Sequence, residues 1–232
     1  MDKHIFLMFN MGNAGGQYFE DICNTHEDVQ IWQEVNHFLG VDKLDSSTQL
    51  DRAYDFFMVQ CRRNPKKTVG LIKTFDERLI KLAGENNGSI MQMFRHPIGI
   101  VGFKNSLKMA ECKQRGLFEK LDTPDKIFEA HVEFYASRYK AYTDNSDKWP
   151  VVKLEDLKKS LREGTSYFED IMKRALKVDW REKHTQRVIA MGGLEENTDH
   201  FEVWESWSER CKEIFFGYFE DIMKLYHYEW ER

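Results

Sequence analysis

The chain opens with a short, unbroken run of apolar residues, after which the apolar positions change to helical spacing. Residues Ile5 to Phe9 are all apolar, which is typical of a strand buried on both faces of a parallel sheet. The turn that follows is built of small residues and holds three glycines, Gly12, Gly15 and Gly16. Beyond the turn, apolar residues fall on one face of a helix, at Tyr18, Phe19, Ile22 and Cys23. The pattern therefore predicts a strand, a glycine-rich turn and a helix.

This arrangement is suited to binding a phosphate. It presents unpaired backbone N–H groups and the positive end of a helix dipole to an anion. No Gly-Lys-Ser/Thr sequence follows the turn, so the strict Walker pattern is absent. A turn between a strand and a helix also uses glycine for its geometry alone. From this stretch by itself, both interpretations stay open.

The rest of the chain alternates between apolar runs and helical spacing. We predict further strands at 68–75, 89–94 and 149–154, and a loop with extended pieces over 29–38. Helices are predicted over about 47–63, 76–83, 106–115, 155–161 and 167–176, from Thr123 onward, and from Trp204 to Ile222. In the helix that begins at Thr123-Pro124, the inward face is predicted to be Ile127, Ala130, Phe134, Ser137 and Ala141.

Strands that alternate with helices indicate an α/β protein. We expect three layers, with a mostly parallel central sheet and helices on both faces. No linker or low-complexity segment divides the sequence, so we predict a single domain over residues 1–232. The polar segment 177–197 contains the pair Gly192-Gly193, for which a plain surface turn is the simplest interpretation.

Composition narrows the classes of function. Apolar residues make up 41% of the chain, which is ample for a core, and the formal net charge of −5 disfavours a broad nucleic-acid surface. Four distant cysteines without a CxxC pair suit a reducing compartment, so we expect a cytoplasmic protein. We expect no signal peptide and no membrane partner. None of the eight histidines has another three or four residues away, so we predict no metal site.

Four short segments, taken together, resemble the sulfotransferase family. They are GGQYFEDI after the first strand, VGLIKTF, QMFRHP and VVKLEDL, and their order and spacing match the family over about residues 4 to 160. The resemblance implies a P-loop NTPase-like α/β fold of the sulfotransferase type. It also implies the co-substrate 3′-phosphoadenosine 5′-phosphosulfate (PAPS), whose sulfonate is moved to a hydroxyl or amine of a small-molecule or carbohydrate acceptor, without a metal.

The resemblance also implies roles for particular residues. The turn Gly12, Asn13, Ala14, Gly15, Gly16 and Gln17 would wrap the 5′-phosphate, and Arg95 would meet the 3′-phosphate. The family serine eight positions after the third-strand arginine falls on Phe103, with Lys104 and Ser106 as the nearest polar substitutes. Gly192-Gly193 falls where the family has a glycine-containing loop over the 3′-phosphate, with Arg187 upstream, although a plain surface turn is the simpler interpretation. Asp76 or Glu77 would lie near the acceptor, and a carboxylate with a raised pKa can serve as the base. The alternative for both residues is a helix N-terminus, where the dipole favours a carboxylate.

Several positions depart from the family pattern. Asn13 replaces the lysine or arginine of the phosphate loop, and Phe75 replaces the histidine that commonly serves as base. Lys73 is the nearest cation that could replace the loop lysine from the next strand. The alternatives are therefore a catalytically decayed protein that binds PAPS or its product PAP, or less favourably a P-loop kinase. The aromatic stripe of Trp204, Trp207 and Phe215 is either core or a homodimer face.

Overall fold

The computed structural model describes residues 3–10, 14–33, 46–73, 76–103, 123–145, 147–194 and 200–228. Two compact units are formed by the chain. The first comprises Met1–Phe94 with Trp149–Glu195, and the second comprises Arg95–Lys148 with Glu196–Arg232. Each unit therefore combines two separate stretches of the sequence. The predicted single domain stays a prediction.

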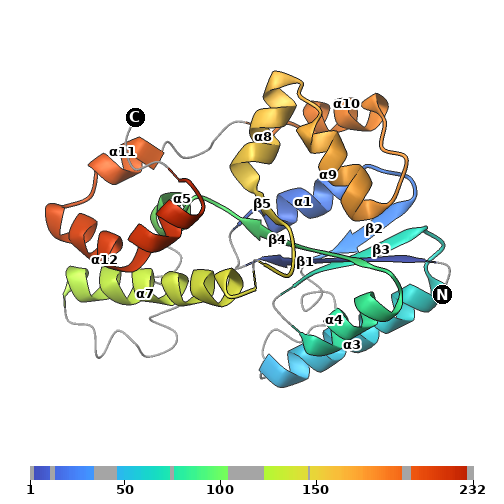
Figure 1. The fold of residues 1–232 in the computed structure, drawn as a ribbon, viewed down its shortest axis with the longest axis horizontal. Helices are drawn as coiled ribbons and strands as arrows, with labels where there is room; N and C mark the ends of the chain where they lie inside the picture. Colours follow the sequence, from blue (N-terminus) through green and yellow to red (C-terminus); the bar gives the residue numbers. More distant parts are fainter. Residues whose placement is uncertain are drawn as a thin grey trace. The chain divides into compact units, whose positions relative to one another are not determined.

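The first unit is built on a five-stranded sheet whose order is β2-β3-β1-β4-β5 (Figure 1). Every strand pairs in parallel with its neighbour. The strands are β1 (His4–Asn10), β2 (Val29–Trp32), β3 (Thr68–Lys73), β4 (Ser89–Phe94) and β5 (Val151–Lys153). The central strand, β1, is buried from Ile5 to Asn10, as the continuous apolar run predicts. The predicted parallel sheet is confirmed.

Helices cover both faces of this sheet. One face carries α1 (Gly16–Cys23), α8 (Leu154–Glu163), α9 (Tyr167–Leu176) and α10 (Glu182–Met191), as Figure 1 shows. The opposite face carries α3 (Ser46–Arg63) and α4 (Glu77–Glu85). Helices on both sides satisfy the two apolar faces of a parallel sheet, which the sequence of β1 demands. The predicted three-layer α/β architecture is confirmed.

Strand order and register place the carboxyl ends of the strands along one edge of the sheet. Phe9 of β1 is in register with Lys73 of β3, and Asn10 is in register with Met93 of β4. The chain continues from β1 to β2 and β3 on one side and then crosses to β4 on the other. Such a reversal next to the carboxyl end of a central strand is where α/β proteins bind ligands.

Two elements of the first unit were missed by the sequence pattern. We predicted a loop with extended pieces over 29–38, whereas Val29–Trp32 forms the edge strand β2. Only alternate residues of this four-residue strand are buried, so it lacks the continuous apolar run that marks the inner strands. The helix α10 lies in the segment interpreted as polar, because His184 and Val188 are its only buried residues.

The second unit contains helices α5 (Pro97–Phe103), α7 (Pro124–Thr143), α11 (His200–Glu205) and α12 (Glu209–Leu225). Thr123 caps α7, as predicted, and its hydroxyl accepts a hydrogen bond from the backbone N–H of Lys126 at 3.4 Å. The predicted helix over 106–115 lies outside the described residues.

The predicted inward face of α7 is wrong. The buried residues are Phe128, His131, Val132, Tyr135, Ala136, Tyr139 and Tyr142, whereas Ser137 and Ala141 are exposed. Tyrosine and histidine are hard to place from a pattern because they combine an apolar ring with a polar tip. Here the polar tips have partners inside the unit. The hydroxyl of Tyr139 donates to the carbonyl oxygen of Arg95, and Nε2 of His131 lies 3.3 Å from the carbonyl oxygen of Val101.

The predicted last helix is two helices. α11 ends at Glu205, and α12 begins after Ser208, whose hydroxyl accepts a hydrogen bond from the N–H of Cys211 at 3.1 Å. The buried side of α12 consists of Ile214, Phe215, Phe219 and Met223. Trp204 of α11 is buried, and its ring lies 5.9 Å from that of Phe215. The core interpretation of the aromatic stripe therefore fits these two residues.

Candidate functional site

The turn after β1 ends in a glycine that begins the first helix. Gly15 has a left-handed backbone, with φ 88° and ψ 21°, and its carbonyl oxygen accepts the first helical hydrogen bond from Phe19 at 2.9 Å. Side chains that commonly cap a helix are absent from this end, because Gly15 itself is the capping residue. The start of α1 thus offers backbone N–H groups at the positive end of the helix dipole.

The surroundings of the turn explain why glycine occupies both positions. A Cβ atom at Gly15 would lie 2.6 Å from Cδ2 of Leu154, the first residue of α8. A Cβ atom at Gly16 would collide with the amide of Asn10, and it would lie 2.7 Å from Oε1 of Gln33. The turn is therefore packed tightly against the carboxyl ends of β1 and β2 and against α8.

The structure brings together part of the predicted phosphate loop. Ala14 is buried beside Gly15 and Gly16, whereas Gln17 is exposed and donates a hydrogen bond to Asp21 at 3.2 Å. Gly12 and Asn13 lie outside the described residues.

A tyrosine connects this turn to the second glycine pair. Gly193 has a positive φ of 74°, and a Cβ atom there would lie 3.2 Å from the ring of Tyr18. The amine of Lys158, on α8, lies 5.2 Å from the centre of the same ring. The buried hydroxyl of Tyr18 has no hydrogen-bond partner in the described part of the chain. A buried polar atom without a partner is unusual in a folded protein.

The sequence pattern did not predict that Tyr18 and Lys158 lie together beside the turn, and for Gly192-Gly193 a plain turn was the simpler of two interpretations. The available signal was the order of segments, because the aromatic residue directly after the phosphate loop is part of the family pattern. Lys158 carries no such signal, since it becomes a neighbour of Tyr18 only through the packing of α8. Arg187, upstream of the glycine pair, donates a hydrogen bond to the carbonyl oxygen of Thr25 at 3.2 Å.

The strands β3 and β5 each end in a lysine. Lys73 is the last residue of β3 and is in register with Phe9, so its backbone lies beside the end of β1. Lys153 is the last residue of β5 and is in register with Phe94. The side chain of Lys73 lies outside the description, so its role as the replacement cation stays a prediction.

Asp76 has a structural role at the start of α4. Its carboxylate accepts hydrogen bonds from the backbone N–H of Arg78 at 3.0 Å and from the guanidinium of Arg78 at 3.1 and 2.8 Å. Burial alone would raise the pKa of Asp76, but the hydrogen bonds from Arg78 outweigh it, so the pKa lies below its usual value. The raised pKa required of a base at this position is therefore not found. Glu77, the other predicted carboxylate, is the exposed first residue of α4.

Arg95 directly follows β4 in the chain and belongs to the second unit. Its carbonyl oxygen is held by the hydroxyl of Tyr139. Thr74, Phe75, Lys104 and Ser106 lie outside the described residues, and so does the side chain of Phe103. The predicted contact of Arg95 with a 3′-phosphate stays a prediction.

A cluster of His26, Glu27 and His184 lies on the first unit, with ligand atoms within 4.8 Å of one another. The Nδ1 atoms of both histidines accept backbone N–H groups, from Asp28 at 3.1 Å and Arg181 at 3.0 Å. In the neutral rings Nε2 must then carry the proton, and that of His184 donates to Glu27 at 3.0 Å. These nitrogens are used as hydrogen-bond donors, whereas a metal needs an unprotonated one. The cluster therefore has the bonding of a structural contact.

No protein-family model matches the sequence, and no curated protein matches it. Two solved structures are similar to this chain in fold. Mouse sulfotransferase SULT7A1, crystallised in complex with PAP, is similar with a TM-score of 0.57 and 9% identity, over 99% of this chain and 90% of that one. The sulfotransferase domain from the curacin biosynthetic pathway is similar with a TM-score of 0.52 and 11% identity, over 99% of each chain.

The likeness to these structures shows the fold. The chain is an α/β protein with the sulfotransferase fold, as the ordered set of four motifs predicts. Among the described residues, no helix is both long enough and apolar enough to cross a membrane. The described cysteines Cys23, Cys61 and Cys211 are free thiols.

Proposed function

We propose that the protein is a sulfotransferase that uses PAPS and moves its sulfonate to a hydroxyl or amine of a small-molecule or carbohydrate acceptor. The observation that carries this proposal is the start of α1, where a left-handed Gly15 presents the helix N-terminus at the carboxyl end of the central strand. The same fold in a sulfotransferase crystallised with PAP supports the choice of nucleotide. A reducing, cytoplasmic location and the absence of a nucleic-acid partner stay part of the proposal.

In this proposal the protein supplies binding, charge and a base. Backbone N–H groups of the turn hold the 5′-phosphate, and Arg95 holds the 3′-phosphate. Lys73 supplies the cation that Asn13 lacks and stabilises charge on the leaving phosphate. Because Asp76 is engaged by Arg78, Glu77 is the better base for the proton of the acceptor.

A second candidate function is favoured by a specific observation. The replacement of the loop cation by Asn13, together with the depressed pKa of Asp76, fits a protein that binds PAP or PAPS without turnover. The P-loop kinase stays the least favoured alternative, because the Walker lysine and its Ser/Thr neighbour are absent from the turn.

The two candidates are separated by a turnover assay. The full chain is incubated with PAPS labelled in the sulfonate group and with a panel of phenols, alcohols, amines and sugars. We expect acceptor-dependent release of PAP and label in one class of acceptor. If PAP binds but no acceptor is labelled, the protein binds the nucleotide without turnover, and the second candidate function is the correct one.

A further inference from the structure

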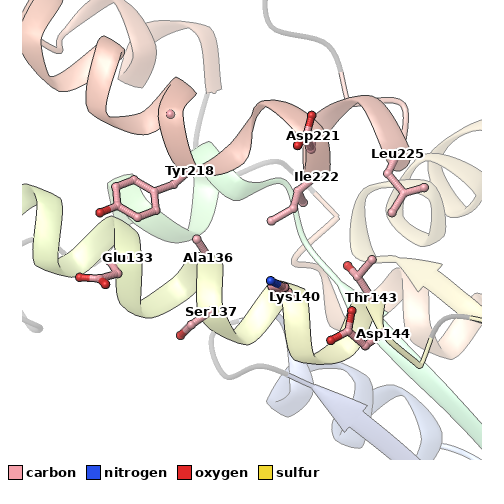
Figure 2. Close-up of a pocket in the computed structure, with 11 residues that line it drawn as sticks. Glu133, Ala136, Ser137, Lys140, Thr143, Asp144, Tyr218, Asp221, Ile222 and Leu225 are labelled. Atoms are coloured by element: carbon pink, nitrogen blue, oxygen red, sulfur yellow. The ribbon is translucent and has the colours of Figure 1, made fainter.

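The second unit contains a groove between α7 and α12, which run side by side (Figure 2). Its volume is about 500 Å³, within the range of about 300–1,000 Å³ that is typical of small-molecule sites. The two helices are held together by the rings of Tyr139 and Phe219, 5.4 Å apart. The hydroxyl of Tyr226 also donates to that of Thr143 at 3.1 Å. The groove is therefore framed by two helices that already have their own packing contacts.

Much of the groove surface is apolar. Ala136 is buried and Ile222 is half-buried, while Tyr218 and Leu225 are 36% and 53% exposed. Figure 2 shows Tyr218 toward one end of the groove and Leu225 toward the other. These side chains offer apolar surface against which an occupant could pack.

Gly217 has no structural reason to be glycine. It lies inside α12, and glycine is the poorest helix former after proline. A Cβ atom at Gly217 would meet nothing within 4 Å. The glycines of α5 differ, because a Cβ atom at Gly99 or Gly102 would collide with His200 or Val203. Gly84 in α4 has the same free space, so the glycine by itself assigns no ligand. At Gly217, which lines the groove, its effect is that no side chain enters the groove.

The groove is acidic. Its lining includes the carboxylates of Glu133, Asp144 and Asp221 and the single amine of Lys140, which gives a net charge of −3 + 1 = −2. None of these four residues forms an ion pair within the described part of the chain. Asp144 also stands at the C-terminal end of α7, where the helix dipole adds negative potential. An occupant with positive charge is therefore favoured.

We infer that this groove binds a small organic cation with an apolar body, such as an alkyl or aryl amine. The apolar body packs on Ala136 and Ile222, and the ammonium group is attracted by the lining carboxylates, among them Asp221. A neutral molecule of the same shape would leave the carboxylates without a partner, and an anion would be repelled. The inference is independent of sulfonate transfer, since it concerns binding by the second unit alone.

The first experiment compares three probes that differ only in the head group. The full chain is titrated calorimetrically with n-octylamine, n-octanol and n-octanoate at pH 7.5. We expect saturable one-to-one binding of n-octylamine, at least about tenfold weaker binding of n-octanol, and none of n-octanoate. Equal binding of all three probes, or no saturable binding of n-octylamine, would overturn the inference.

The second experiment places the site. Gly217→Leu fills the groove, while Gly84→Leu is the matched control, because a Cβ atom at Gly84 in α4 also meets nothing within 4 Å. We expect Gly217→Leu to abolish n-octylamine binding and Gly84→Leu to leave it unchanged. Asp221→Asn, at an exposed position, should weaken n-octylamine about tenfold and n-octanol little. If Gly217→Leu lowers the melting temperature, the test rests on Asp221→Asn instead. Wild-type affinity of Asp221→Asn for n-octylamine would contradict the inference.

Discussion

Gly15 and Leu154 lie so close that a single Cβ atom at Gly15 would stand 2.6 Å from the Leu154 side chain. The contact joins the turn after β1 to the first residue of α8, two segments about 140 residues apart in the sequence. Position 15 therefore requires glycine for two reasons. Its backbone is left-handed, and the side chain of Leu154 leaves no room for a Cβ atom.

We predict that Gly15→Ala destabilises the protein more than Gly164→Ala does. Gly164 also has a positive φ, 66°, but a Cβ atom there meets nothing within 4 Å. Both variants lose about 1–2 kcal/mol to the left-handed backbone, and Gly15→Ala loses more because Leu154 must move. Urea unfolding of both variants measures the difference. Equal losses would show that the contact with Leu154 contributes nothing.

The charge of Asp76 should stabilise the protein above about pH 4 and lose its effect in acid. The folded-state pKa lies below the usual value of 3.8, so the fold favours the carboxylate. We predict that Asp76→Asn, which keeps an N-cap acceptor, lowers stability by about 1 kcal/mol at pH 7. This difference should shrink as the pH falls through the folded-state pKa.

The control for this prediction is Asp51→Asn. Asp51 also pairs with Arg78, at 2.6 Å, but its side chain is 65% exposed and the pair is screened by solvent. Thermal melts at pH 7 and pH 3 should therefore show almost no change for Asp51→Asn at either pH. A loss in Asp76→Asn that is the same at both pH values would mean that its charge is unimportant.

The choice of catalytic base is tested by exchanging the two neighbouring carboxylates separately. We predict that Glu77→Gln lowers kcat by about 10²- to 10⁴-fold, the usual contribution of a general base, with little change in PAPS binding. Asp76→Asn should keep most of the turnover, because Asp76 is engaged by Arg78. The reverse result in a steady-state assay would return the role of base to Asp76.

The missing loop cation gives a further prediction. If Lys73 supplies the charge that Asn13 lacks, Lys73→Met should abolish turnover and leave PAP affinity nearly unchanged, because the charge is needed mainly in the transition state. Asn13→Lys should then have no effect or lower the rate. Should Asn13→Lys raise kcat instead, with wild-type PAP affinity, Lys73 is not the replacement.

The sequence predicts the inner framework of the fold well and its exposed elements poorly. The continuous apolar run of β1 and the mostly apolar segment of β4 are typical of strands covered on both faces, and the structure contains both strands. The edge strand β2 and the helix α10 bury few residues, so their apolar pattern is too sparse. In α7 the hydroxyl of the buried Tyr139 donates to the carbonyl oxygen of Arg95, a distant partner that local spacing does not reveal.

The candidate site is predictable where chemistry depends on backbone shape. Glycines at the end of a buried strand mark the turn, and the structure shows a left-handed Gly15 at this position. Asp76 and Arg78 lie within one helical turn, so their pairing is visible in the sequence. The resulting pKa of Asp76 is not, because burial raises this pKa while the hydrogen bonds from Arg78 lower it. The approach of Gly193 and Lys158 to Tyr18 is set by the packing of distant segments, so no local pattern contains it.

Arg95 provides a specific test of nucleotide recognition. We predict that Arg95→Ala weakens PAP about tenfold to a hundredfold, through loss of a charge-assisted hydrogen bond to the 3′-phosphate. Arg52→Ala, at an exposed position of α3, is the control and should bind PAP like the wild type. Calorimetric titration measures both affinities, and equal values would assign Arg95 a purely structural role.

The central claim is tested most directly by comparing PAP with ATP-magnesium in a thermal-shift experiment on the wild-type chain. We predict that PAP stabilises the protein without added magnesium, by about 2.7 kcal/mol at a hundred times its Kd. In the proposed function the N–H groups of the turn and the charge of Arg95 would hold the phosphates without a metal. Stabilisation by ATP-magnesium and not by PAP would contradict the account and favour a kinase.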